Sequence, residues 1–181
     1  NGLMIASLAE AGFVFGEQRW IDAATRAFDA VLAHESDGHL AHSWRKGKAS
    51  AQGLLEDYAL MAGAALKLHE ITGDSDYLAA AERWVAVLDG HFWDEREGGY
   101  FQRPDGGEAL IVRAKSAADH AVPSGNGAMV GVLERLALAT GDDDYDSRGE
   151  ALVTTFSGGV ERNFFPLATL SASTAGARTK T

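Results

Sequence analysis

Residues 58–89, "YALMAGAALKLHEITGDSDYLAAAERWVAVLD", decide the fold. The first half is apolar on nearly all sides, which is typical of a buried helix. Gly73 follows, where a glycine can end a helix in the left-handed conformation, and Asp74 or Ser75 can cap the next helix. The second half, 76–89, is amphipathic with a helical period. The stretch therefore predicts a hairpin of an inner apolar helix, a tight turn and an outer amphipathic helix.

The chain repeats this pattern. Three segments align: "GEQRWIDAATRAF" from Gly16, "GDSDYLAAAERWV" from Gly73 and "GDDDYDSRGEALV" from Gly141. In each, an aromatic residue follows the glycine after three mostly polar residues, and a small residue comes four positions later. We therefore expect three helical hairpins of one kind. The three methionines of the chain stand twelve residues before the three glycines: Met4, Met61 and Met129.

The connectors alternate in length. Those inside a hairpin are tight turns, whereas those between hairpins are long and cover roughly 34–53 and 90–124. Long irregular connectors inside compact domains are usually functional. The second one contains "GGYFQRPDGGEALIVRAK", which predicts a small β-hairpin near 99–114 around a Pro-Asp-Gly-Gly turn.

These elements predict an all-α fold. If the inner helices run parallel, the long connectors gather at one end, above the inner-helix N-termini. Six such hairpins close into an (α/α)6 toroid with its ligand funnel at that end. We predict that residues 1–170 form about half of such a ring, and that 171–181, "SASTAGARTKT", is a disordered or artificial tail.

Composition narrows the function classes. The net charge is −10, which argues against nucleic acid or an anionic membrane as a partner. There is no run of 18 apolar residues, so no membrane span is predicted. Without cysteine there is no disulfide framework and no thiolate metal site. We predict a cytoplasmic protein that takes a small ligand, although Asn1 as the first residue leaves a targeting signal open.

Polar side chains collect at the end of the second long connector, in "RAKSAADHAVPSGN". Arg113 and Asp119 could form a pair that orients a substrate hydroxyl or carboxylate, or an ion pair that only pins the connector. Lys115 would share a face with Arg113 in an extended segment. We predict a catalytic role for Arg113 and Asp119, and a substrate-binding role for Lys115.

The N-termini of the inner helices are further candidate positions. Asn1, Asp57 and Asn126 stand where these helices begin, and free N–H groups with a partial positive charge suit hydroxyl or carboxylate oxygens. Ser124 could cap its helix or contribute to the pocket. We predict substrate-binding roles for Asn1, Ser124 and Asn126.

Aromatic residues accompany these positions. Asp57 could be a helix cap or a general acid or base, and Tyr58 beside it could stack on a sugar ring or fill the wall of the ring. Tyr100 and Phe101 could form a tight turn with aromatic packing or a binding platform. Trp44 could line the funnel. All four aromatic residues are candidate substrate-binding residues.

The six histidines show no metal-binding signature. His34, His39 and His42 in "HESDGHLAH" lack the helical spacing of a zinc motif. His42 and His120 lie on the long connectors, where they could act as acid or base groups near neutral pH. We predict no metal ion and no cofactor.

Four segments carry a family resemblance: "NGLMIASLAEAG", "EDYALMAGAALKLHEITGD", "FWDEREGGYF" and "VRAKSAADHAVPSGNGAMV". Together they resemble the C-terminal region of the thioredoxin-domain-containing family related to spermatogenesis-associated protein 20. In that family a thioredoxin-like domain precedes an (α/α)6 region similar to N-acylglucosamine 2-epimerases and six-hairpin glycosidases. The resemblance covers roughly 1–170 and implies a sugar-like pocket, with the rest of the parent chain or a second chain completing the ring.

Three functions are compatible with these residues. The first is a sugar epimerase or isomerase in which His42 or His120 removes a proton and Arg113 holds an oxygen. The second is a glycoside hydrolase with Asp57 and Asp119 as its two carboxylates. The third is a non-catalytic half toroid that binds a ligand or serves as a scaffold.

Overall fold

The computed structural model describes residues 1–49, 51–106, 113–162 and 165–177. The chain divides into two compact units, Asn1–Val87 and Leu88–Thr181, and each is described by itself. Both units are built from helical hairpins, as the apolar inner segments and the glycine turns predict. The single domain expected over 1–170 stays a prediction.

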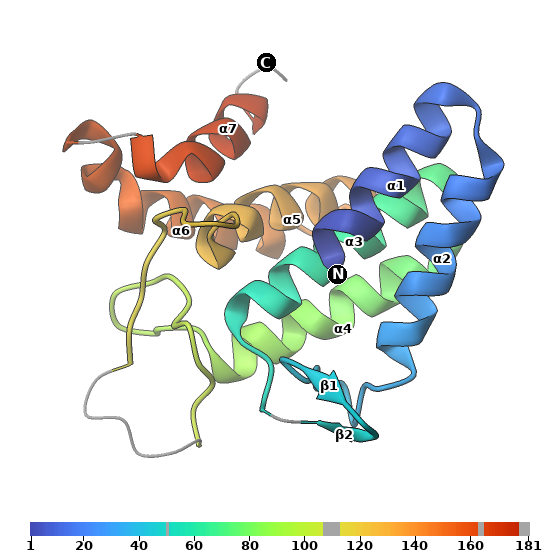
Figure 1. The fold of residues 1–181 in the computed structure, drawn as a ribbon. Coiled ribbons are helices and arrows are strands. Elements are labelled where there is room, and N and C mark those ends of the chain that lie inside the picture. The colour runs from blue at the N-terminus through green and yellow to red at the C-terminus, as the bar shows by residue number, and fades with distance from the viewer. Residues whose placement is uncertain (50, 107–112, 163–164, 178–181) are drawn as a thin grey trace. The chain divides into compact units, whose positions relative to one another are not determined.

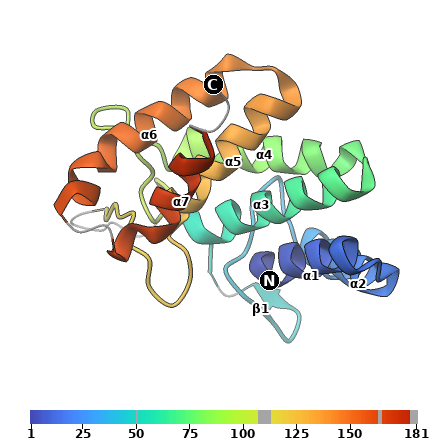
Figure 2. The same cartoon turned by 90° about the horizontal axis from the view of Figure 1, so that it is seen from above.

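The first unit contains α1, α2, α3 and most of α4. These span Gly2–Phe15, Gln18–Leu32, Leu55–Thr72 and Ser75–His91. Helix α1 packs against both α2 and α3, and α1 and α3 run in the same direction (Figures 1 and 2). The ring of Phe28 on α2 lies 5.1 Å from that of Tyr77 and 5.6 Å from that of Trp84, which joins α2 to α4.

The second unit contains α5, α6, a short 3-10 helix η1 and α7. These span Gly125–Thr140, Asp143–Arg162, Phe165–Leu167 and Ala168–Ala177. Helix α5 packs against α6 and α7, and its Met129, Leu133 and Leu136 side chains are fully buried. Among the described residues, no helix combines the length and the apolar character needed to cross a membrane. The cytoplasmic location stays a prediction.

The turns of the hairpins confirm the sequence repeat. Gly16, Gly73 and Gly141 end α1, α3 and α5 with φ angles of 68°, 74° and 72°. A left-handed backbone of this kind strains any residue with a Cβ atom, which explains the glycines. The carboxylate of Asp74 then accepts the N–H of Asp76 at 2.9 Å, as the predicted cap of the following helix requires.

Among the described residues, the small sheet lies in the first long connector. Strands β1 (Trp44–Arg45) and β2 (Lys48–Ala49) are antiparallel. Lys46 and Gly47 between them both have positive φ, 50° and 76°, which is the type I′ turn that matches the strand twist.

In the second connector, the described residues of 99–114 form no strand, and residues 107–112 lie outside the described part. The N–H of Gln102 donates to the carbonyl of Ala114 at 2.9 Å. Tyr100 forms an isolated bridge with Trp93 instead, because the turn at Gly98 and Gly99 folds the chain back on the end of α4.

The predicted tail over 171–181 is wrong for residues 171–177, because these continue helix α7. The helix forms because tertiary contacts hold it. The carboxylate of Asp119 accepts the N–H of Thr169 in its first turn at 2.8 Å, and Leu170 is buried. Composition alone does not reveal contacts of this kind. Residues 178–181 lie outside the described part.

Candidate functional site

The first unit joins two of the predicted catalytic residues. The Nδ1 atom of His42, on the first long connector, lies 2.8 Å from Oδ2 of Asp57 in the first turn of α3. The same carboxylate oxygen accepts the backbone N–H of Leu54 at 2.8 Å. Asp57 therefore caps α3, which is one of its two predicted roles, and also holds the imidazole of His42. Its other predicted role, as a general acid or base, stays a prediction.

This pairing has a chemical consequence for His42. A neutral imidazole that donates from Nδ1 to a carboxylate keeps Nε2 as a proton acceptor. The carboxylate also stabilises the imidazolium that forms after proton transfer. The side chain of His42 is 50% exposed, so a ligand can approach it. The pair therefore has the geometry of a general base, His42, that is oriented by a carboxylate, Asp57.

Tyr58 lies in the core of the first unit. The residue is 2% exposed, and its hydroxyl accepts the N–H of Leu40 at 3.0 Å, with Nδ1 of His39 at 3.5 Å. Burial raises the pKa of the Tyr58 phenol. These contacts hold the connector on α3, which agrees better with filling the wall than with stacking on a sugar.

Two other predicted binding residues of this unit are exposed. The ring of Trp44 stacks on that of His34, with centroids 4.2 Å apart and planes 11° apart. Asn1 precedes α1 in the N-cap position, but its side chain makes no capping hydrogen bond.

Sequence reasoning missed Glu56 as a candidate. It precedes Asp57 in the first turn of α3, and its Oε2 atom is buried without a hydrogen-bond partner among the described residues. A buried acceptor without a partner costs free energy, so the position favours a ligand or group that donates to it. Acidic residues are common in first turns for electrostatic reasons, so nothing in the sequence beyond its position marked Glu56.

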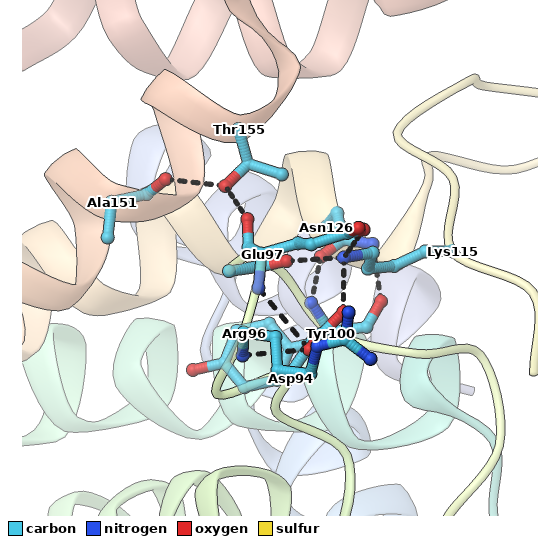
Figure 3. A network of polar contacts seen from close by, with 9 residues as sticks. Asp94, Arg96, Glu97, Tyr100, Lys115, Asn126, Ala151 and Thr155 are labelled. Atoms are coloured by element: carbon cyan, nitrogen blue, oxygen red, sulfur yellow. Dashed lines mark hydrogen bonds and ion pairs between the residues drawn. The ribbon is translucent and has the colours of Figure 1, made fainter.

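In the second unit, Asn126 fixes the long connector to the start of α5 (Figure 3). The residue is fully buried. Its Oδ1 accepts the N–H of Tyr100 at 2.9 Å, and its Nδ2 donates to the carbonyls of Tyr100 at 2.9 Å and Ser116 at 2.8 Å. Both amide hydrogens are therefore bonded to backbone carbonyls. The side chain makes the hydrogen bonds that a neighbouring strand would otherwise make.

Tyr100 is also buried. Its hydroxyl donates to Oδ1 of Asp89 at 2.6 Å, and its ring meets that of Trp93 edge-on at 4.9 Å. Burial, followed by the negative charge of Asp89, raises the pKa of the Tyr100 phenol well above its usual value. Burial also raises the pKa of Asp89. The geometry agrees with a tight turn and aromatic packing, the alternative to a binding platform.

Arg113 holds the connector together rather than pairing with Asp119. Its guanidinium donates to the backbone carbonyls of His91 at 2.8 Å and Arg103 at 2.7 Å. The same group lies over the ring of Phe101, 4.1 Å from the centroid. The Nε and Nη2 donors of Arg113 are thus directed at the protein backbone and not at a ligand.

Lys115 also makes structural contacts, with the turn that follows Trp93 (Figure 3). Its Nζ donates to Oδ2 of Asp94 at 2.7 Å and to the carbonyl of Gly98 at 2.7 Å. The hydrogen bond from Lys115 holds the pKa of Asp94 below its usual value. The turn that follows Asp94 also reaches α6, where the hydroxyl of Thr155 donates to the carbonyl of Glu97 at 3.1 Å.

Ser124 is the N-cap of α5, which confirms its capping role. Its hydroxyl accepts the N–H of Gly127 at 3.1 Å and donates to the carbonyl of Ala117 at 2.8 Å. Asp119 accepts the N–H groups of Ser124 and Thr169, each at 2.8 Å. Burial opposes its ionisation, but these hydrogen bonds together hold the pKa of Asp119 below its usual value.

His120 is exposed, and its backbone N–H donates to the carbonyl of Val122 at 3.2 Å. Within the part of the chain that the structure describes, no cluster of three or more metal-ligating side chains occurs.

The candidate residues fall into the two units. Asn1, His42, Trp44, Asp57 and Tyr58 belong to the first, and Tyr100, Phe101, Arg113, Lys115, Asp119, His120, Ser124 and Asn126 belong to the second.

Comparison with known sequences confirms the resemblance. The chain is 33% identical over 174 residues to spermatogenesis-associated protein 20 of Rattus norvegicus and of Homo sapiens. The match covers 90% of this chain but only 22% of those proteins, so the chain spans about a fifth of their length. No protein-family model matches the chain.

Comparison with solved structures confirms the toroid fold. The chain superimposes on a family 76 α-mannanase of Bacteroides thetaiotaomicron with a TM-score of 0.71 and 18% identity, covering 87% of this chain and 43% of that one. For the cellobiose 2-epimerase of Spirochaeta thermophila, the TM-score is 0.66 at 18% identity, covering 86% and 42%. Both are (α/α)6 toroids, and the chain corresponds to somewhat less than half of each.

Proposed function

From a toroid fold shared with sugar-acting enzymes, we propose that this chain contributes a proton-transfer site to a sugar epimerase or isomerase. One observation carries the proposal: the 2.8 Å contact between Nδ1 of His42 and Asp57 at the N-terminus of an inner helix. An oriented imidazole is the most common general base in proteins at neutral pH.

In the proposed reaction, Nε2 of His42 takes the proton from the sugar carbon next to the carbonyl. The electron pair moves onto the carbonyl oxygen, and Asp57 stabilises the imidazolium that results. Return of a proton to the opposite face of the same carbon gives the epimer. Return of a proton to the former carbonyl carbon, with transfer of the neighbouring hydroxyl proton to the former carbonyl oxygen, gives the isomer.

The candidate residues of the second unit make structural contacts within that unit. Arg113 and Lys115 anchor the backbone between α4 and α5, and Asn126 fixes that backbone to α5. The catalytic role predicted for Arg113 and the substrate-binding roles predicted for Lys115 and Asn126 are not part of this proposal, because hydrogen bonds to protein acceptors already engage these side chains.

Glycoside hydrolysis is the second candidate, favoured by the mannanase neighbour. It needs one carboxyl group that is protonated at working pH, which requires a raised pKa. Asp119 has the opposite shift, since hydrogen bonds to its carboxylate outweigh burial and lower its pKa. Asp57 is already engaged by His42 and by Leu54. The Asp57 and Asp119 pair is therefore less suited to this reaction than His42 is to proton transfer.

The test is turnover of simple sugars by the natural full-length protein. Glucose, mannose, N-acetylglucosamine and N-acetylmannosamine are incubated with enzyme, and new anomeric signals are followed by NMR. We expect one of these sugars to convert, and the variant His42→Gln to lose at least about a hundredfold in rate. His120→Gln, an exposed histidine on the other connector, is the matched control. Full activity of His42→Gln would remove the proposed base, and loss in His120→Gln alone would transfer the role.

A further inference from the structure

The β-hairpin of the first connector carries three cations that the chain does not neutralise. Arg45, Lys46 and Lys48 are all exposed, and residues 38–55 contain no acidic residue, although the chain has 26. Within the part of the chain that the structure describes, no carboxylate forms an ion pair with any of the three. By contrast, a carboxylate oxygen lies 2.7 Å from Nζ of Lys115. The hairpin is therefore a small basic surface on an acidic chain.

The register of the hairpin places two of these cations directly opposite each other. Arg45 pairs with Lys48 across the two strands, which brings their side chains to one face with Cβ atoms about 5 Å apart. Like charges at opposed positions repel each other and destabilise the pairing. An anion that lies between the two side chains would remove this repulsion.

The turn between the strands has a second unfavourable residue. Lys46 has a φ of 50°, in the left-handed region that Asn, Asp or Gly adopts more readily than lysine. Gly47 meets the same requirement at a φ of 76° without strain. A cation thus occupies three positions at which a different residue would give a more stable hairpin. Local choices that oppose stability are concentrated at functional sites.

The exposure and the charge of the chain indicate which kind of anion fits. Every residue of both strands is exposed, and the hairpin lies at the margin of the first unit (Figure 1), so it does not enclose a small molecule. The net charge of −10 repels extended polyanions such as nucleic acid or an anionic membrane. A short acidic segment of a protein needs to contact only the hairpin, and its carboxylates match the paired donors of arginine.

We propose that the hairpin 44–49 is a docking surface for an acidic segment of another protein, whose carboxylates bind between Arg45 and Lys48 and at Lys46. Trp44 projects from the opposite face of the hairpin and is not part of this surface. The inference is independent of the proposed proton transfer, because it uses none of the residues of that site.

The experiment measures the fluorescence anisotropy of a labelled peptide of alternating Asp and Ser, titrated with the natural full-length protein. A peptide with Asn in place of Asp is the control ligand. We expect only the acidic peptide to bind, with an affinity that falls as salt is added. Arg45→Gln combined with Lys48→Gln should weaken binding by about tenfold. Arg26→Gln with Arg96→Gln, which removes two exposed cations elsewhere, should leave the affinity unchanged.

Two further variants separate the charge of the hairpin from its structure. Lys46→Asn removes a charge but keeps a residue suited to the left-handed turn, and it should weaken binding by about threefold. Arg45→Lys with Lys48→Arg keeps both charges and should retain the affinity. An unchanged affinity in Arg45→Gln with Lys48→Gln, or an equal loss in the Arg26 and Arg96 control, would overturn the proposal.

Other polyanions test the class of the partner. Double-stranded DNA and vesicles that contain phosphatidylserine are titrated with the same variants. If either binds through Arg45 and Lys48 more tightly than the acidic peptide does, the partner is not an acidic protein segment and the proposal fails. It also fails if the unmodified protein does not bind the acidic peptide at low salt.

Discussion

Asp57 holds two donors with one carboxylate oxygen, the N–H of Leu54 and the imidazole of His42. Substitution separates the two roles. Asp57→Ala removes the helix cap and should lower the free energy of unfolding by about 1 kcal/mol, whereas Asp57→Asn keeps an acceptor and most of that stability. Both variants should lose turnover. Urea unfolding and NMR turnover assays check this, and full turnover in Asp57→Asn would contradict a role for the carboxylate charge.

Asn126 is a fully buried side chain that makes three hydrogen bonds to the backbone. Asn126→Ala leaves the N–H and carbonyl of Tyr100 and the carbonyl of Ser116 without their partner in a buried place. We expect a loss of about 2–4 kcal/mol in the free energy of unfolding. Asn1→Ala, at the matching position of the repeat, should cost less than about 0.5 kcal/mol, because Asn1 is exposed and makes no capping bond. Similar costs for the two substitutions, measured in urea, would refute the structural role of Asn126.

At the scale of the residue, the sequence predicted which polar side chains are of interest better than it predicted the groups that they contact. His42 and Asp57 were both candidates, but fifteen residues and a hairpin separate them, so their contact depends on a register that the sequence did not reveal. Arg113 and Asp119 were expected to pair, yet both make bonds to the backbone instead. Charged side chains in a connector have many backbone acceptors and donors nearby, and spacing does not choose among them.

At the scale of the element, the turn glycines give a matched pair of tests. Gly73 ends α3 with φ of 74°, and Gly90 lies inside α4; an added Cβ would meet no atom within 4 Å at either position. Gly73→Ala should therefore destabilise by about 1 kcal/mol through backbone strain alone. Gly90→Ala should stabilise by roughly 0.5 kcal/mol. Thermal unfolding of both variants distinguishes them, and shifts of the same sign would be incompatible with the left-handed turn.

The second connector should make the fold sensitive to acid. Lys115 lowers the pKa of Asp94, and backbone hydrogen bonds lower that of Asp119 against the effect of burial. A carboxyl group with a lowered pKa in the folded state stabilises the fold above its usual pKa of 3.8. This stability is lost as the pH falls through the folded-state value. Asp89 has the opposite effect on the pH dependence of stability, because burial raises its pKa in the folded state.

We therefore expect the unfolding free energy to fall as the pH is lowered below about 4, and Asp119→Asn to reduce that dependence. Urea unfolding from pH 7 to pH 3 measures it. Asp105→Asn is the control, because Asp105 is exposed and contacts the exposed side chain of His91. A wild-type curve that stays flat over this range, or an unchanged slope in Asp119→Asn, would contradict the account.

The elements predicted best are those defined by local signals. The inner helices, their glycine ends and the two long connectors follow from periodicity and turn chemistry, and the structure confirms them. The strands of the first connector are two residues each and wholly exposed, so no apolar alternation marks them. Helix α7 depends on Asp119 and on the burial of Leu170, which are contacts over about fifty residues.

At the scale of the whole molecule, α1 exposes the helix face that the matching helices of the repeat, α3 and α5, bury. Met61 and Met129 are 4% and 0% exposed, but Met4 at the matching position is 64% exposed. Neighbouring apolar residues on α1 are exposed as well: Leu3, Phe13, Val14 and Phe15. An apolar surface of this kind favours association with another chain or with further helices of a ring.

We expect the isolated 181-residue chain to self-associate for this reason. Leu3→Lys combined with Met4→Lys should shift it toward the monomer, since both substitutions place charge on the exposed face. Light scattering during size-exclusion chromatography measures the mass. Glu82→Gln with Glu95→Gln, a double substitution away from α1 that also raises the net charge by two, controls for the change in net charge. A monomer in the unmodified chain, or no effect of the α1 substitutions, would exclude α1 as an association surface.

The most direct test of the central claim is solvent exchange. The natural full-length protein is incubated with its best sugar in D2O, and deuterium at carbons 1 and 2 is followed by NMR. Proton transfer through His42 predicts deuterium at carbon 2 of an epimer or at carbon 1 of an isomer in the unmodified protein, strongly reduced in His42→Gln and retained in His120→Gln. Conversion of the sugar without deuterium at either carbon, or equal exchange in His42→Gln, would contradict the account.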